Sequence, residues 1–115
     1  MRLFREGEAK EVQGDGYLKR IVMPSGVLPD GMFIQEVLFQ AGQRVPLHHH
    51  LVQTEVFIPL SEGVFVVNGE TVRIGPGDLL VCEPGDVHGN PVIEKDFRIM
   101  VLKLCYHTKD IFWDE

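Results

Sequence analysis

A β-hairpin is predicted by the stretch Val64-Phe65-Val66-Val67-Asn68-Gly69-Glu70-Thr71-Val72-Arg73-Ile74. Both halves are rich in β-branched and aromatic residues, which is typical of strands. The Asn-Gly pair between them is the preferred centre of a type I′ turn, because both central residues of that turn need a positive φ. We therefore expect two antiparallel strands joined by a two-residue turn.

Outward from this hairpin, the chain is a series of short strand-like runs separated by turn residues. Its 12 glycines and 7 prolines leave no uninterrupted helical pattern. Besides the hairpin strands Val64–Val67 and Glu70–Ile74, we expect strands at Tyr17–Met23, Met32–Gln40, Arg44–His50, Glu55–Leu60, Asp78–Cys82, Val87–His88 and Phe97–Leu104. Many short strands in one small chain predict an all-β sandwich or barrel. The amphipathic tail, residues 110–115, is expected to pack on the surface, with one helical turn or a partner contact as alternatives.

Length, composition and charge narrow the class of protein. A chain of 115 residues is the size of one domain, so we expect a single domain over residues 1–115. Hydrophobic residues make up 44% and charged residues 24%, which is typical of an ordered globular protein. The net charge of −6 argues against nucleic acid as a partner, because phosphate binding needs lysine and arginine. No apolar run approaches the ~20 residues of a membrane span, so no membrane partner is expected.

The chain ends and cysteines indicate a compartment. The first residues lack the apolar segment of a secretory signal peptide, which predicts a cytoplasmic protein. Cys82 and Cys105 are far apart and lack a CxxC spacing, so neither a disulfide framework nor a structural zinc site is expected. Both are interpreted as unpaired core cysteines.

The most distinctive polar feature is the run His48-His49-His50. Strand side chains alternate, so His48 and His50 share one face with Cα atoms about 6.5–7 Å apart, and His49 points the other way. Two imidazoles at this spacing are able to bind one metal ion at ~2.0–2.1 Å. By itself, the pair is equally well explained as a histidine-rich surface loop.

Two further residues extend the pair to a possible metal site. Glu55 follows a short turn and opens the next expected strand, and His88 would arrive from a distant strand. Imidazoles with one carboxylate suit one divalent transition metal ion, namely Fe, Mn, Ni or Zn. Four protein ligands leave octahedral positions open for water, O₂ or a substrate, which is typical of a catalytic rather than a structural site.

The order and spacing of these residues resemble a known family. The pattern Gly42-(x5)-His48-x-His50-(x4)-Glu55 resembles the first cupin motif. The second cupin motif is resembled by the stretch Gly77-Asp78-Leu79-Leu80-Val81-Cys82-Glu83-Pro84-Gly85-Asp86-Val87-His88-Gly89-Asn90. The resemblance extends over roughly residues 30–105, the expected motif-bearing barrel. Glu62 is a weaker alternative to Glu55 as the carboxylate ligand.

The resemblance implies a fold and a site. It implies an antiparallel double-stranded β-helix, also called a jelly roll or cupin barrel, with a metal held inside by His48, His50, Glu55 and His88. Small cupins are often homodimers, so a homodimer is expected. Their activities range from dioxygenases and isomerases to sensors, and the fold alone does not choose among them.

Strand alternation also predicts walls of a substrate pocket. On the strand Met32–Gln40, the set that contains Gln35 is the more apolar face and is expected to point inward. Gln35 would then orient a small ligand, or else bond to the backbone. Phe57 shares the face of Glu55, and Val101 is placed inward because this puts Arg98 outside. No lysine or arginine stands out as an anchor for an anion.

These features favour a metal-dependent enzyme, dioxygenase-like or isomerase-like, that acts on a small organic molecule held in the barrel. The alternative is a non-catalytic cupin that binds a small ligand or metal and works with a separate partner protein. A barrel with a vestigial metal site is a third, weaker interpretation.

Overall fold

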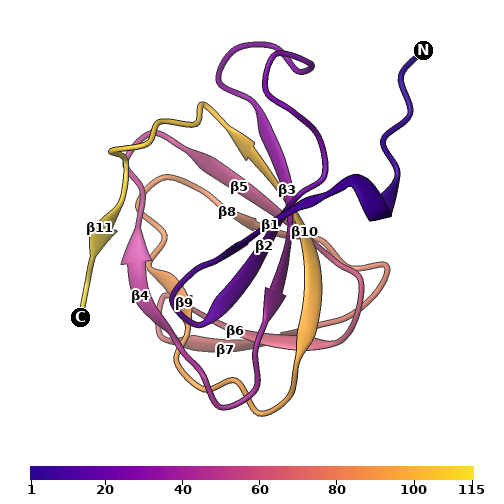
Figure 1. The fold of residues 1–115 in the computed structure, drawn as a ribbon. Coiled ribbons are helices and arrows are strands. Elements are labelled where there is room, and N and C mark those ends of the chain that lie inside the picture. The colour runs from indigo at the N-terminus through magenta and orange to yellow at the C-terminus, as the bar shows by residue number, and fades with distance from the viewer.

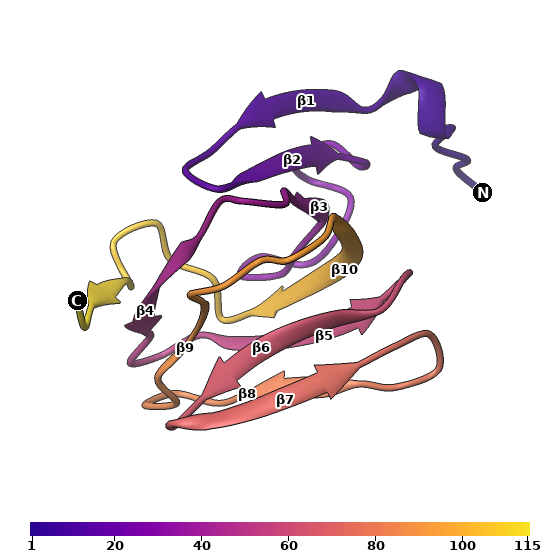
Figure 2. The same cartoon turned by 90° about the horizontal axis from the view of Figure 1, so that it is seen from below.

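Two antiparallel sheets face each other and enclose the core (Figures 1 and 2). The computed structural model describes residues 1–115. The first sheet has the strand order β1 (Lys10–Gln13), β2 (Tyr17–Ile21), β3 (Phe33–Phe39), β10 (Phe97–Leu104), β5 (Thr54–Pro59) and β8 (Leu80–Cys82). The second has the order β11 (Phe112–Trp113), β4 (Val45–His49), β9 (His88–Asn90), β6 (Gly63–Val67) and β7 (Glu70–Ile74). The 3-10 turn η1 (Glu6–Glu8) precedes β1.

The path of the chain makes this a double-stranded β-helix. From β3 to β11 the chain passes to the opposite sheet at every connection except the β6–β7 hairpin. The predicted all-β jelly-roll fold is therefore confirmed. Figure 2 shows β1 and β2 along one side of the molecule and the edge strands β7 and β8 along the opposite side. Nothing helical in the chain has the length and apolar character needed to cross a bilayer.

The hairpin of β6 and β7 has the expected turn. β6 and β7 pair from Gly63 opposite Ile74 to Val67 opposite Glu70. Asn68 has a φ of 50° and Gly69 a φ of 79°. Both central residues are thus in the left-handed region, as a type I′ turn requires.

Every predicted strand exists, and two strands were not predicted. β1 forms a hairpin with β2 at the edge of the larger sheet, and all four of its residues are exposed. β11 pairs with β4 through Phe112 opposite His49 and Trp113 opposite His48. The helical turn considered as an alternative for the tail is therefore wrong, because β4 offers an open edge that the tail fills as a strand.

The inward side chains change character along β10, the strand in the middle of the larger sheet. At its start Phe97 is opposite Phe39, and the two rings stack at 4.6 Å. Near its end Lys103 is opposite Glu55. One end of the barrel is thus filled with apolar side chains, and the other is lined with polar ones.

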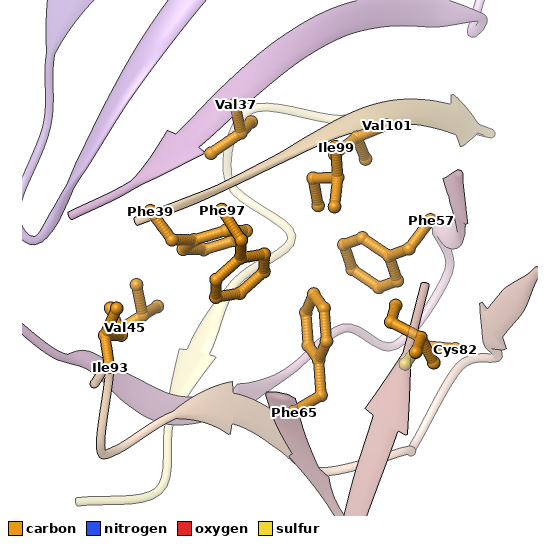
Figure 3. Close-up of a cluster of buried hydrophobic side chains, with 11 residues drawn as sticks. Val37, Phe39, Val45, Phe57, Phe65, Cys82, Ile93, Phe97, Ile99 and Val101 are labelled. Atoms are coloured by element: carbon orange, nitrogen blue, oxygen red, sulfur yellow. The ribbon is translucent and has the colours of Figure 1, made fainter. Parts of the chain in front are cut away.

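The apolar end is built around aromatic rings (Figure 3). Phe65 is 1% exposed and its ring centre lies 4.8 Å from that of Phe57 and 5.7 Å from that of Phe39. Ile99 and Val101 are also buried in this cluster, as their predicted inward orientation requires.

Glu36 is buried on the opposite face of the larger sheet. Its carboxylate accepts hydrogen bonds from Arg20 at 3.0 Å and from Arg98 at 2.6 Å. The side chain of Arg98 is 47% exposed, so its predicted outward position is confirmed. The alternation of β3 therefore places Glu36 outside the barrel interior, where the side chains of Arg20 and Arg98 cover it.

Candidate metal centre

Four predicted ligand side chains converge at the polar end of the barrel. His48 lies near the end of β4, His50 directly follows that strand, Glu55 comes from β5 and His88 from β9. One nitrogen or oxygen atom from each lies within 4.8 Å of the others. Three of the four residues are buried, and His48 is half-buried. Three imidazoles and one carboxylate thus lie close together on the interior surface of the barrel.

Local backbone features bring His48 and His88 side by side. The two residues are directly opposite each other in the β4–β9 pair, after an irregularity between Val45 and His48. A Cβ atom at Gly89 would lie 2.8 Å from the carbonyl oxygen of Val45 and 2.9 Å from that of Pro46. Glycine at this position therefore permits the close approach that seats His88.

Backbone carbonyl groups fix the tautomers of all three imidazoles. Each Nδ1 contacts a carbonyl oxygen: in His48 that of Pro46 at 2.8 Å, in His50 that of Asp110, and in His88 that of Asp86 at 2.9 Å. Because a carbonyl oxygen only accepts hydrogen bonds, each Nδ1 is the donor. In the neutral rings the lone pairs are therefore on the Nε2 atoms, which face the cluster. Such carbonyl contacts are the usual support for metal-binding histidines.

The carboxylate of Glu55 lies among these lone pairs. Its Oε1 atom is 2.7 Å from Nε2 of His50 and 3.1 Å from Nε2 of His88. Burial acts to raise the pKa of Glu55, but the contacts with His50 and His88 outweigh it and lower the pKa far below its usual range. Burial, followed by the charge of His88, lowers the pKa of His48 to about 4. The cluster thus favours an ionised carboxylate and a neutral His48, the forms in which both bind metals.

The donor set fits one metal ion. Nε2 of His50 is buried without a well-directed hydrogen bond, even though Glu55 is close. A lone pair facing a carboxylate is favourable only with a proton or a cation between them. Two ligands of one ion at ~2.1 Å are at most about 4.2 Å apart, so the atoms need to close by only about half an ångström.

Other candidate residues lie outside the cluster. His49 points away from the barrel, as predicted, where it contacts Asp114 at 2.7 Å and stacks on Phe112 at 5.5 Å. Glu62 is exposed and does not belong to the cluster. Glu55, and not Glu62, is therefore the carboxylate that lies beside the three histidines.

The two cysteines differ from each other. Both are free thiols, as predicted, but Cys105 is exposed and only Cys82 is a core residue. Cys82 is opposite Glu55 in the sheet. Burial first, then the charges of Glu55 and Asp86, raise the pKa of the Cys82 thiol to about 12. Its thiol is therefore protonated at neutral pH, and Cys82 does not belong to the cluster.

A cavity of about 220 Å³ opens onto the cluster. Gln35, Phe57 and Val101 all line it, and each is less than 5% exposed. The structure thus brings the three predicted pocket residues to one space with the four histidine and glutamate side chains. A larger open groove of about 740 Å³ runs over β6 and β7, but none of these residues belongs to it.

The tail contributes to the centre, which the sequence reasoning missed. The carboxylate of Asp110 accepts hydrogen bonds from the backbone N–H groups of Leu51, Val52 and Gln53 at 2.8–3.0 Å. Trp113 packs against His48 with ring centres 5.2 Å apart and lines the cavity. The tail thus holds the turn after His50 and packs against His48, and Figure 1 shows β11 beside β4.

Comparison with known proteins identifies the family. Residues 35–102 match the family described as "Cupin domain", so the chain belongs to the cupins. No curated protein matches the sequence significantly.

Solved structures share the fold at low sequence identity. The uridine complex of PAC13 from Streptomyces is 15% identical over 100% of this chain and 92% of its own, with a TM-score of 0.76. The polyketide cyclase RemF from Streptomyces resistomycificus is 17% identical over 100% and 86%, with a TM-score of 0.82. KdgF from Halomonas sp. is 20% identical over 92% and 96%, with a TM-score of 0.76. At these identities the likeness shows the fold alone.

Proposed function

We propose that this cupin is a metal-dependent enzyme that acts on a small organic molecule held in the barrel. The observation that carries the proposal is the opening of the cavity onto three imidazoles with fixed tautomers and one carboxylate. A metal site that adjoins a ligand-sized space is typical of catalysis, whereas structural sites are closed.

The roles of the residues follow from their positions. His48, His50, Glu55 and His88 would hold one divalent ion, Fe, Mn, Ni or Zn. Bound there, the ion would supply Lewis-acid chemistry, or O₂ chemistry if it is iron or manganese. The Gln35 amide would orient the ligand by hydrogen bonding, and the apolar walls Phe57 and Val101 would exclude water.

The structural neighbours support an enzyme without choosing its reaction. PAC13 is described as a nucleoside dehydratase and was solved with uridine, and RemF is a polyketide cyclase. Both the dioxygenase-like and the isomerase-like reaction therefore remain within the proposal. A homodimer formed through an open strand edge, such as the exposed β1, is part of the same proposal.

Elemental analysis of untagged protein, purified anaerobically without chelators, tests the proposal. We expect about one transition metal ion per chain and turnover in a panel of oxygenase, isomerase and hydrolase assays with the reconstituted metals. A protein that takes up no metal even after reconstitution would contradict the proposal. Ligand-induced thermal stabilisation without turnover would instead support a binding protein.

Metal affinity is expected to depend on pH. A histidine must be neutral to bind a metal, so protons compete with the ion. Burial acts to lower the pKa of His50, but Glu55 and the Asp110 carbonyl raise it above its ordinary value. Protons therefore compete with the ion at His50, while His48, with a pKa of about 4, stays neutral.

We expect the apparent affinity to fall about tenfold per pH unit once the pH is below the pKa of His50. Competition with a chromophoric chelator between about pH 8 and pH 5 measures this fall. An affinity that does not change over this range would argue against histidine ligation.

A further inference from the structure

The cavity contains a positively charged side chain that has no part in the proposed metal centre. Lys103 follows the inward alternation of β10 and lines the cavity, although no lysine was expected there. Its ammonium group lies 5.0 Å from the centre of the Tyr106 ring. A second cavity lysine, Lys19, lies 5.6 Å from the Tyr17 ring. Both ammonium groups thus contact aromatic faces on the cavity wall.

Neither lysine forms a salt bridge within the protein. The two carboxylates that line the cavity are already engaged. Glu55 belongs to the cluster, and Asp110 accepts three backbone hydrogen bonds. Lys103 is opposite Glu55 in the β10–β5 pair, and burial lowers the pKa of its ammonium group whereas the charge of Glu55 raises it. A divalent ion would leave this cavity with excess positive charge.

A half-buried ammonium without a partner is unfavourable unless a ligand supplies the opposite charge. We propose that Lys103 binds a carboxylate group of the molecule held in the cavity, with Lys19 adding to the positive potential. This proposal rests on the proposed function, since it names the substrate class of the same cavity: small organic acids. Lys103 is then a specificity-determining residue at the end of β10.

Size and chemistry favour a carboxylate over a phosphate. The cavity of about 220 Å³ is smaller than the roughly 300–1,000 Å³ of pockets that hold drug-sized ligands, which favours a small acid. None of its lining residues is an arginine, the side chain whose fork suits bidentate phosphate binding.

A matched pair of probes tests the proposal with zinc-loaded protein. Succinate and butyrate have chains of equal length, and butyrate replaces one carboxylate by a methyl group. In the zinc-loaded protein the first carboxylate of either acid would bind the ion, so only succinate has a second carboxylate for Lys103. Ligand-detected NMR titration should show that wild type binds succinate about ten- to a hundredfold more tightly, the range for a hydrogen bond between charged groups. In Lys103→Gln this preference should fall to near one, and Lys103→Arg should restore part of it. The matched control is Lys95→Gln, an exposed lysine outside the cavity, which should keep the full preference.

Each outcome separates this proposal from the proposed enzyme. Equal affinity of wild type for the two acids, or an undiminished preference in Lys103→Gln, overturns the role of Lys103 while leaving metal uptake and turnover intact. Tighter binding of 3-phosphonopropionate than of succinate overturns the carboxylate class. A preference for succinate in the zinc-loaded protein, together with no turnover in any of the metal-reconstituted forms, contradicts the enzyme and supports the carboxylate site. Zinc content near one ion per chain in Lys103→Gln shows that the variant has folded.

Discussion

Replacing His50 with alanine is expected to reduce the bound metal from about one ion per chain to less than a tenth under the same purification. The change removes one of the three imidazoles that we propose as nitrogen ligands, and Glu55 loses its closest partner at 2.7 Å. Loss of a supporting contact alone typically costs 10–100-fold in metal affinity, so loss of the ligand itself should cost at least as much. Metal content by elemental analysis and turnover in any assay that the wild type passes should fall together.

The neighbouring histidine is a matched control for this experiment. His49 differs from His50 by one position but points away from the barrel, where it contacts Asp114. His49→Ala should therefore keep about one ion per chain. Equal metal loss in both variants would show that the strand has been disrupted, and full retention in His50→Ala would remove His50 from the site.

The fold was predictable because its signals are local. The Asn68-Gly69 turn and the short runs between glycines and prolines each depend on neighbouring residues. The two missed strands, β1 and β11, depend on partners elsewhere. β11 exists because β4, more than 60 residues earlier, leaves an edge open. Its two residues carry no period of their own that distinguishes a strand from a turn.

The candidate site was predictable to the same extent. Alternation along one strand separates His48 and His50 from His49, and the motif spacing adds Glu55 and His88. The position of Lys103 follows from the same alternation beyond Val101, but lysine is a residue type that is usually exposed. Its place opposite Glu55 depends on the register between β10 and β5, which the sequence pattern does not specify. The contact between Asp110 and His50 joins residues 60 apart and leaves no local signal.

The second large effect concerns the ring at the centre of the apolar end. Phe65→Ala is expected to lower the free energy of unfolding by about 3–5 kcal/mol, the cost of lost burial plus the cavity that remains. Phe65 is 1% exposed and its ring contacts those of Phe39, Phe57 and Phe97 (Figure 3). No side chain can close the space without moving several rings at once. A domain of this size has only about 5–15 kcal/mol of stability, so the variant would lose a large fraction of it.

Urea unfolding of the metal-free protein measures this effect, with a chelator present because a bound ion would add its own stabilisation to the native state. The control is Leu79→Ala, which removes an apolar side chain that is 65% exposed and should change stability by less than about 0.5 kcal/mol. A loss below about 1 kcal/mol in Phe65→Ala would mean that the apolar end is not close-packed. Because Phe65 supports Phe57, whose ring lies 5.8 Å from that of His88, the variant should also bind metal more weakly wherever it remains folded. A loss of stability with unchanged metal affinity would show that the two ends of the barrel are independent.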